Sequence, residues 1–94
     1  MTIVWSPRAL SHLEGLRAYI AHDSPTAARG LAASLLTAVE RLADMPNLGR
    51  PGRVSGTREL VVAGTPYVIA YRVRSNRVEI IGVFHGRQKW PKRL

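Results

Sequence analysis

A histidine that is followed closely by two cations is the best candidate for chemistry in this sequence. His85 closes a run of β-forming residues and precedes Arg87 and Lys89. An imidazole can serve as a general acid or base, and neighbouring cations can stabilise the negative charge of a phosphorane-like transition state. A histidine at a strand end can also cap the strand through backbone hydrogen bonds. The sequence alone favours this structural role.

Three arginines fall within predicted strands. Arg58 shares its strand face with Leu60 and Val62, because side chains alternate along a strand with a period of two. An arginine among apolar neighbours normally has a designated partner. Arg72 and Arg74 fall on the less apolar side of their strand, where they contact either a polyanion or water.

Several kinds of site are excluded or not indicated. The chain has no cysteine, which rules out a thiolate nucleophile, a disulfide framework and a cysteine-based metal site. His12 and His22 fall on a predicted helix without a carboxylate at ligand spacing, so we expect no metal. Residues 49–52 lack the spacing and the following helix of a phosphate-binding loop. We expect no cofactor.

The positive charge lies entirely in the second half of the chain. Residues 1–49 carry four arginines and four carboxylates, whereas residues 50–94 carry ten Lys or Arg and two carboxylates, which accounts for the net charge of +8. This segregation predicts a polyanionic partner, although a basic surface can also serve solubility alone. The Gly- and Pro-rich residues 46–56 carry Arg50 and Arg53 and could approach an anion closely, but loops of this composition are usually connectors.

Two serine–proline pairs mark the starts of two helices. Ser6 and Ser24 are the expected N-caps, each with proline at the first helical position. Apolar residues at helical spacing extend these helices over residues 7–23 and 25–45. Only a few residues separate the helices, so they must form an antiparallel hairpin that packs against one face of a sheet.

Most of the β-forming residues are near the C-terminus. Three runs rich in β-branched and aromatic residues cover residues 57–62, 67–74 and 77–84. The Ser75-Asn76 turn is short enough to require an antiparallel hairpin. With a short strand over residues 2–5, the sequence predicts an α+β fold. In this fold, the helix hairpin packs on a small antiparallel sheet that is closed by a three-stranded C-terminal meander.

Length and composition indicate one domain over residues 1–94, with a core large enough to fold alone. No apolar run approaches the ~20 residues of a membrane span. The N-terminus lacks a basic segment followed by an apolar one, as a signal peptide would have. We therefore expect a soluble, cytoplasmic protein with no membrane partner.

The order of these elements, with several short motifs, resembles the RelE/ParE superfamily of bacterial toxins, which are the toxin halves of type II toxin–antitoxin modules. The resemblance covers essentially the whole chain, and the order and spacing of the motifs are more specific than any one of them. The motifs are Tyr19-Ile20, Ser24-Pro25 with Ala27-Ala28, Leu42, Pro46 and Gly49-Arg50, Arg58-Glu59-Leu60, and residues 66–73 and 78–86.

The superfamily has two activities on one fold, and the fold alone does not distinguish them. RelE-like members are ribosome-dependent mRNA endonucleases, and ParE-like members poison DNA gyrase. A nuclease would use Arg58, His85 and Arg87 as catalytic residues, but Leu60 and Val68 replace two of its basic positions. The long helix hairpin favours the ParE-like branch, with the nuclease as the alternative. A non-toxic basic nucleic-acid-binding module fits the charge but not the motif order.

The resemblance also implies partners: an acidic antitoxin of the ParD or RelB type, and either DNA gyrase or the ribosome with its mRNA. The residues expected to bind the antitoxin are Leu13, Leu16, Tyr19, Ile20, Leu31 and Leu35. The residues expected to bind the target are Arg58, Arg72, Arg74, Arg87, Lys89 and Trp90, although Trp90 is also a candidate for packing. Arg58 and residues 85–87 are expected to lie close enough to share one anionic site.

Overall fold

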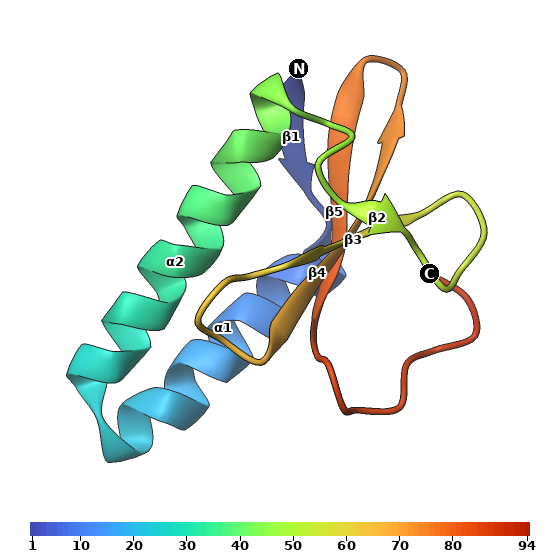
Figure 1. Ribbon diagram of the computed structural model, residues 1–94. Coiled ribbons are helices and arrows are strands. Elements are labelled where there is room, and N and C mark those ends of the chain that lie inside the picture. The colour runs from blue at the N-terminus through green and yellow to red at the C-terminus, as the bar shows by residue number, and fades with distance from the viewer.

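The computed structural model describes residues 1–94 and places two helices against a five-stranded sheet (Figure 1). The elements are β1 (Thr2–Trp5), α1 (Pro7–Asp23), α2 (Pro25–Asp44), β2 (Arg50–Pro51), β3 (Arg58–Val61), β4 (Tyr67–Arg74) and β5 (Arg77–His85). The strand order across the sheet is β1-β5-β4-β3-β2. This arrangement confirms the predicted α+β fold.

Both helices begin where the serine–proline pairs predict. Ser6 Oγ accepts a hydrogen bond from Ala9 N at 3.0 Å, and Ser24 Oγ accepts one from Ala27 N at 3.1 Å. Only Ser24 separates the helices, so they form the expected hairpin. Neither helix is both long and apolar enough to cross a membrane.

The predicted meander of β3, β4 and β5 is confirmed, with antiparallel pairing throughout. Ser75 and Asn76 have φ angles of 53° and 59°, as a two-residue hairpin turn with two left-handed positions requires. Two features differ from the expected sheet. Strand β1 pairs in parallel with β5, because the helix hairpin carries the chain across before it returns, and the sheet is therefore mixed. Strand β2 pairs with β3 inside the predicted loop.

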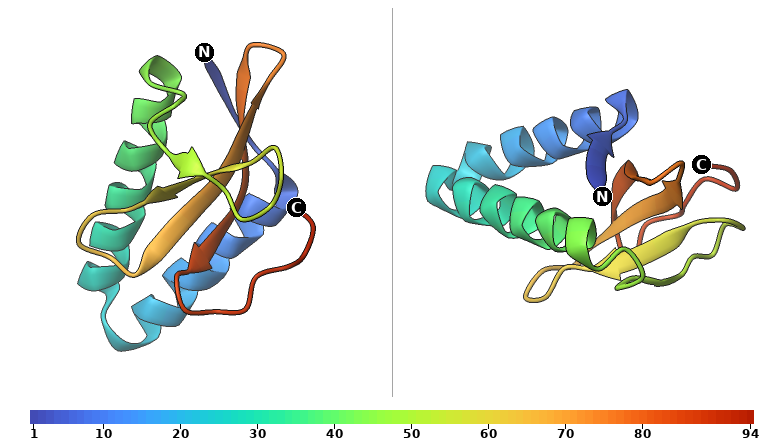
Figure 2. Two further views of the ribbon diagram at one scale, coloured as in Figure 1. Left: turned by 45° about the vertical axis from the view of Figure 1, so that its right-hand side comes forward. Right: turned by 90° about the horizontal axis from the view of Figure 1, so that it is seen from above.

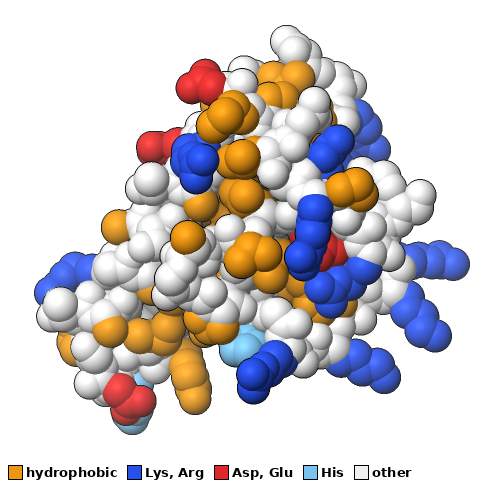
Figure 3. Space-filling model, viewed as in Figure 1, with side chains coloured by type: hydrophobic (Ala, Val, Ile, Leu, Met, Phe, Trp, Pro, Cys, Tyr) orange, Lys and Arg blue, Asp and Glu red, His pale blue; other side chains and the backbone are white.

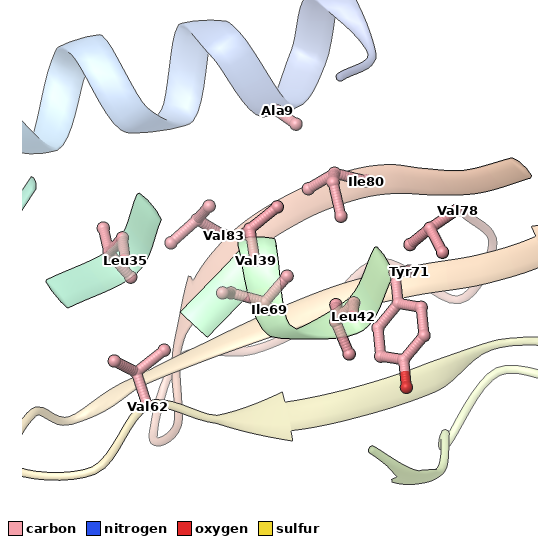
Figure 4. Packing of buried hydrophobic residues seen from close by; sticks show 10 residues of the cluster. All are labelled: Ala9, Leu35, Val39, Leu42, Val62, Ile69, Tyr71, Val78, Ile80 and Val83. Atoms are coloured by element: carbon pink, nitrogen blue, oxygen red, sulfur yellow. The ribbon is translucent and has the colours of Figure 1, made fainter. Parts of the chain in front are cut away.

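The sheet is apolar on both faces. The larger cluster lies between the helices and the sheet (Figure 4) and includes Leu35, Leu42, Ile69 and Tyr71. On the opposite face, residues 86–94 cross the sheet without regular secondary structure, and we call them the C-terminal segment (Figure 2). The smaller cluster lies beneath this segment and comprises Val68, Ala70, Ile81, Phe84 and Trp90. The predicted alternation along β4 is therefore confirmed.

His12 joins α1 to β5 at an irregularity in the sheet. The register between β4 and β5 shifts so that Ala70 pairs with Gly82 and Tyr71 with Ile80. Next to this bulge, Val83 N donates a hydrogen bond to His12 Nδ1 at 3.1 Å. Burial, and then the charge of Arg8, lower the pKa of His12. The imidazole is therefore held as a neutral acceptor and has a structural role.

Candidate functional site

Residues 45–57, which we call the arginine loop, are fixed to the sheet by one buried tyrosine. The Tyr71 hydroxyl donates to Pro46 O at 2.7 Å and accepts from Gly49 N at 2.8 Å. Burial raises the pKa of Tyr71, although the Gly49 amide and Arg58 act in the opposite direction. A Cβ at Gly49 would lie 2.7 Å from atoms of the tyrosine side chain, so only glycine fits there. The phenol is therefore a neutral structural group.

Arg58 supports the same loop. Its half-buried side chain donates from Nη1 to Gly49 O at 2.7 Å. Arg58 lies opposite Tyr71 on the neighbouring strand, which confirms that it is on the apolar face of the sheet. The predicted hydrogen-bond partner is also present. That partner is a backbone carbonyl group inside the protein. Removal of Arg58 would leave this carbonyl without its donor, so the residue contributes to the fold as well as to the charge.

Glu59 is buried beneath the arginine loop, and it is not among the site residues predicted from the sequence. Its side chain is 3% exposed. It accepts hydrogen bonds from Arg53 N at 2.7 Å, Arg53 Nε at 3.1 Å, Arg53 Nη2 at 3.2 Å and Arg50 Nη2 at 3.4 Å. Burial acts to raise the pKa of Glu59, but the contacts with Arg53 and Arg50 outweigh it, so the pKa is lowered. The sequence feature that could have indicated this role is a single acidic residue close to a loop that carries two arginines.

Trp90 connects the arginine loop to the C-terminal segment. The Arg53 guanidinium carbon lies 3.8 Å from the Trp90 ring centroid, and the indole stacks on Phe84 at 4.5 Å between centroids. Trp90 is only 9% exposed. This placement favours the packing role over direct contact with a target.

Exposed cations gather where these two segments meet. The side chains of Arg50 and Arg53 are 59% and 42% exposed. The neighbouring segment adds Lys89, Lys92 and Arg93, which are all exposed. Figure 3 shows Lys and Arg side chains over this side of the molecule. We call these five residues the basic surface. With the buried Glu59, they leave a net charge of +4.

His85 caps the end of β5. Its backbone N donates to Gln88 Oε1 at 2.7 Å, and its Nδ1 accepts from Arg87 N at 3.1 Å. Its ring packs edge-on against Tyr67 at 5.6 Å between centroids. These contacts are the capping role that the sequence favours, and they leave Nε2 as the ring nitrogen that can act on another molecule. Arg87 is exposed.

The predicted shared site of Arg58 with residues 85–87 is wrong. Strands β3 and β5 are both antiparallel to β4, so they run parallel to each other. Arg58 begins β3 opposite Tyr71, whereas His85 ends β5 opposite Tyr67. Four residues along the sheet and two strand spacings across it separate their backbones by about 16 Å. His85 lies at one end of the sheet, whereas Arg58 lies opposite the middle of β4.

The other predicted target-binding arginines have partners within the protein. Arg72 is half-buried, and its Nη2 donates to Leu94 O at 3.1 Å. Arg74 and Arg77 both pair with Glu79, at 2.9 Å and 3.3 Å. Arg72 therefore holds the C-terminal segment, and Arg74 belongs to a surface ion-pair group next to the β4–β5 turn.

The helices expose part of the predicted antitoxin-binding set. Tyr19 is 76% exposed, and four others are half-buried: Leu13, Leu16, Ile20 and Leu31. The prediction is wrong for Leu35, which is fully buried because it faces the sheet. Beside α2, a hollow of about 510 Å³ is lined by Ile20, Leu31 and Tyr67, among other residues. No group of three or more His, Cys, Asp or Glu side chains comes together anywhere in the chain.

Comparison with known proteins gives matches over nearly the whole chain. Residues 3–90 match the family described as the ParE toxin of the type II toxin–antitoxin system parDE. The protein Y4kP of Sinorhizobium fredii, which is named as a toxin, is 50% identical over 92 residues, covering 98% of this chain and 95% of its own. Toxin RelE2 of Caulobacter vibrioides is 43% identical over 83 residues, covering 88% and 92%.

Two solved structures share the fold. A chain of the chromosomal ParDE toxin–antitoxin system from P. aeruginosa superimposes with a TM-score of 0.80 at 23% identity, covering 90% of this chain and 95% of that one. A chain of the RelBE2 toxin–antitoxin complex from Mycobacterium tuberculosis gives a TM-score of 0.63 at 22% identity, covering 89% and 95%. At these identities the likeness concerns the fold alone.

Proposed function

The chain belongs to the family of ParE toxins of type II toxin–antitoxin systems, and we propose that it stops bacterial growth by inhibiting DNA gyrase. The observation that carries this choice of target is the separation of Arg58 from His85. A ribosome-dependent nuclease, the alternative, needs an acid or base and its cations around one phosphate group. Here the backbones of Arg58 and His85 are about 16 Å apart across the sheet.

The contacts of the individual residues support the same choice. A general acid or base must come within about 2.6–3.2 Å of the proton that it transfers, and the cations must lie close to the charge that develops. Arg58 is bound to Gly49 O, and His85 Nδ1 accepts from the Arg87 amide. Only His85 Nε2 and the Arg87 side chain remain for such chemistry. These are fewer catalytic groups than the nuclease pattern requires. An inhibitor that acts by binding needs no such cluster.

A cognate antitoxin would bind the helix layer. Leu10, Tyr19 and Leu36 are 51%, 76% and 44% exposed, which is high for large apolar side chains. An amphipathic segment of the antitoxin would cover exposed apolar side chains of this layer together with the hollow beside α2, which Ile20 and Leu31 line. An acidic sequence suits a toxin with a net charge of +8. Both gyrase and this partner would be met in the bacterial cytoplasm.

The test measures replication and translation separately. Purified protein is added to a gyrase supercoiling assay and, in parallel, to a translation extract in which mRNA ends are mapped. We expect loss of supercoiling with accumulation of cleaved DNA, intact protein synthesis, and recovery of gyrase when the cognate antitoxin is added. Translation arrest with codon-phased mRNA cleavage, and normal supercoiling, would instead establish the nuclease activity.

A further inference from the structure

We infer that the basic surface binds the phosphate backbone of double-stranded DNA. The surface consists of Arg50 and Arg53 from the arginine loop and Lys89, Lys92 and Arg93 from the C-terminal segment. The inference rests on the proposed function in one respect, since gyrase acts on duplex DNA and would present that DNA to a bound inhibitor. The surface would then add a contact to the nucleic acid beside the contact to the enzyme.

The first support is the distribution of charge. The five cations of the basic surface are exposed, and the carboxylate among them, Glu59, is buried. The rest of the chain also carries a net charge of +4, but this charge is dispersed. Residues 1–49 have no net charge, Arg74 and Arg77 share Glu79, and Arg58 and Arg72 are half-buried and hydrogen-bonded within the protein, which leaves Arg87 exposed. A concentrated patch of exposed cations attracts a polyanion, and release of condensed counterions drives the binding.

The second support is that Arg53 is held in place before any ligand arrives. Glu59 holds the Arg53 side chain through Nε and Nη2, and Trp90 lies against its guanidinium plane. Arg50 uses only Nη2 on Glu59. In both residues Nη1 makes no hydrogen bond within the protein and can donate to a phosphate oxygen. Side chains that are already ordered lose less entropy on binding.

The third support separates duplex DNA from single-stranded RNA or DNA. Proteins that bind single strands present aromatic rings on which bases stack. Trp90 is the one aromatic residue in the two segments, and its ring contacts Arg53 and Phe84 while only 9% of the residue is exposed. The surface therefore offers charge without a stacking platform. Such a surface binds the backbone of a duplex without reading its sequence.

The experiment measures binding of a fluorescently labelled DNA duplex to the free protein by anisotropy over a series of salt concentrations, without gyrase. The test variant removes three charges from the C-terminal segment: Lys89→Gln, Lys92→Gln and Arg93→Gln. A matched control removes three charges from the helices: Arg8→Gln, Arg29→Gln and Arg41→Gln. Both variants have the same net charge, and circular dichroism melting confirms that each is folded.

We expect the test variant to bind the duplex roughly tenfold more weakly at low salt, with a log–log salt slope that is smaller by about 3. The control should retain the slope of the original protein. Equal losses in both variants would show that only net charge matters and would overturn the inference. Absence of salt-dependent duplex binding by the original protein would also overturn it, and this result needs no variant.

Two further ligands test the identity of the partner. Single-stranded RNA of the same length and a polyglutamate of the same charge should both bind more weakly than the duplex. Tighter binding of either would overturn the inference in favour of an RNA or an acidic protein. A supercoiling assay on the same samples separates this result from the proposed function. Gyrase inhibition without duplex binding would refute only the inference that the basic surface binds DNA. Duplex binding without gyrase inhibition would refute only the proposal that gyrase is the target.

Discussion

The arginine loop, which contains the two-residue strand β2, and the irregular C-terminal segment are held on the sheet in different ways. The loop is fixed by the buried Tyr71 hydroxyl, which has two partners, and by Glu59, which accepts four hydrogen bonds. The segment is held mainly by the stacked Trp90 and by a hydrogen bond from Arg72 to Leu94 O. Two buried donors there, Trp90 Nε1 and Arg72 Nε, have no partner.

This difference indicates unequal local stability. A buried donor without a partner costs about 1–3 kcal/mol, whereas a satisfied buried network stabilises one conformation. The C-terminal segment should therefore open locally at a lower free energy than the arginine loop. The basic surface joins a rigid half to a looser half. It can present a fixed Arg53 and still adapt its lysines to a ligand.

The largest expected effect is at the tyrosine that fixes the loop. Tyr71→Phe removes the group that binds Pro46 O and Gly49 N, and leaves both without a partner. We expect the free energy of unfolding to fall by about 2–4 kcal/mol. Denaturant unfolding measures this loss. Tyr67→Phe is the matched control, because the Tyr67 hydroxyl makes no hydrogen bond in the protein, and it should cost less than about 0.5 kcal/mol. Equal losses would refute the proposed anchoring role of Tyr71.

The next effect concerns the anchor of the C-terminal segment. Trp90→Ala removes the ring that lies between Phe84 and Arg53. Tryptophan-to-alanine changes in a core usually cost about 3–5 kcal/mol, but we expect about 2 kcal/mol because the segment can detach while the rest stays folded. Hydrogen exchange should lose protection over residues 86–94 and keep it in β4. Simultaneous loss of protection in β4 would show that the segment belongs to the main cooperative unit.

A smaller effect depends on pH. The pKa of Glu59 is lower in the folded protein, so the unfolded state binds a proton first as the pH falls. Its contribution is fully present above the unfolded pKa of about 4.3 and is lost as the pH falls through the lower folded pKa. Glu59→Gln should cost about 1 kcal/mol at pH 7 and flatten the stability curve below about pH 4.3. The pKa of His12 is also lowered, but His12 is present in both proteins, so its contribution cancels in the difference. An unchanged slope at low pH would contradict this assignment.

Local sequence signals predicted the elements well. Ser6 and Ser24 act as N-caps within three residues of their partners, and the Ser75-Asn76 turn determines the β4–β5 pairing by itself. The alternation of side chains along β3 placed Arg58 on the apolar face with Leu60 and Val62, because a period of two is a property of any strand. These features depend on contacts that are close in the sequence.

The features that were missed depend on contacts that are distant in the sequence. The parallel pairing of β1 with β5 and the bulge near Tyr71 involve residues about 75 and 10 positions apart, so no local pattern encodes them. The burial of Glu59 follows from the position of Arg53 in the loop. The separation of Arg58 from His85, in contrast, follows from topology: in a three-stranded meander the outer strands run parallel, so the start of one lies far from the end of the other.

The smallest expected effect is at His85, where the C-terminal segment begins. His85→Ala removes an imidazole that accepts from the Arg87 amide and packs against Tyr67, contacts that order a turn at the surface. If the protein inhibits gyrase by binding, the change should alter the inhibitory concentration in a supercoiling assay by less than about threefold, since one local turn is affected. If His85 were a proton-transfer residue of a nuclease, the same change would instead lower the rate by about 10²–10⁴.

His85→Gln is the second variant, because the glutamine amide oxygen can accept a hydrogen bond from the Arg87 amide but glutamine cannot transfer a proton at neutral pH. Full activity in His85→Gln with loss in His85→Ala would assign His85 to the turn, whereas loss in both, together with mRNA cleavage by the original protein, would assign it to catalysis.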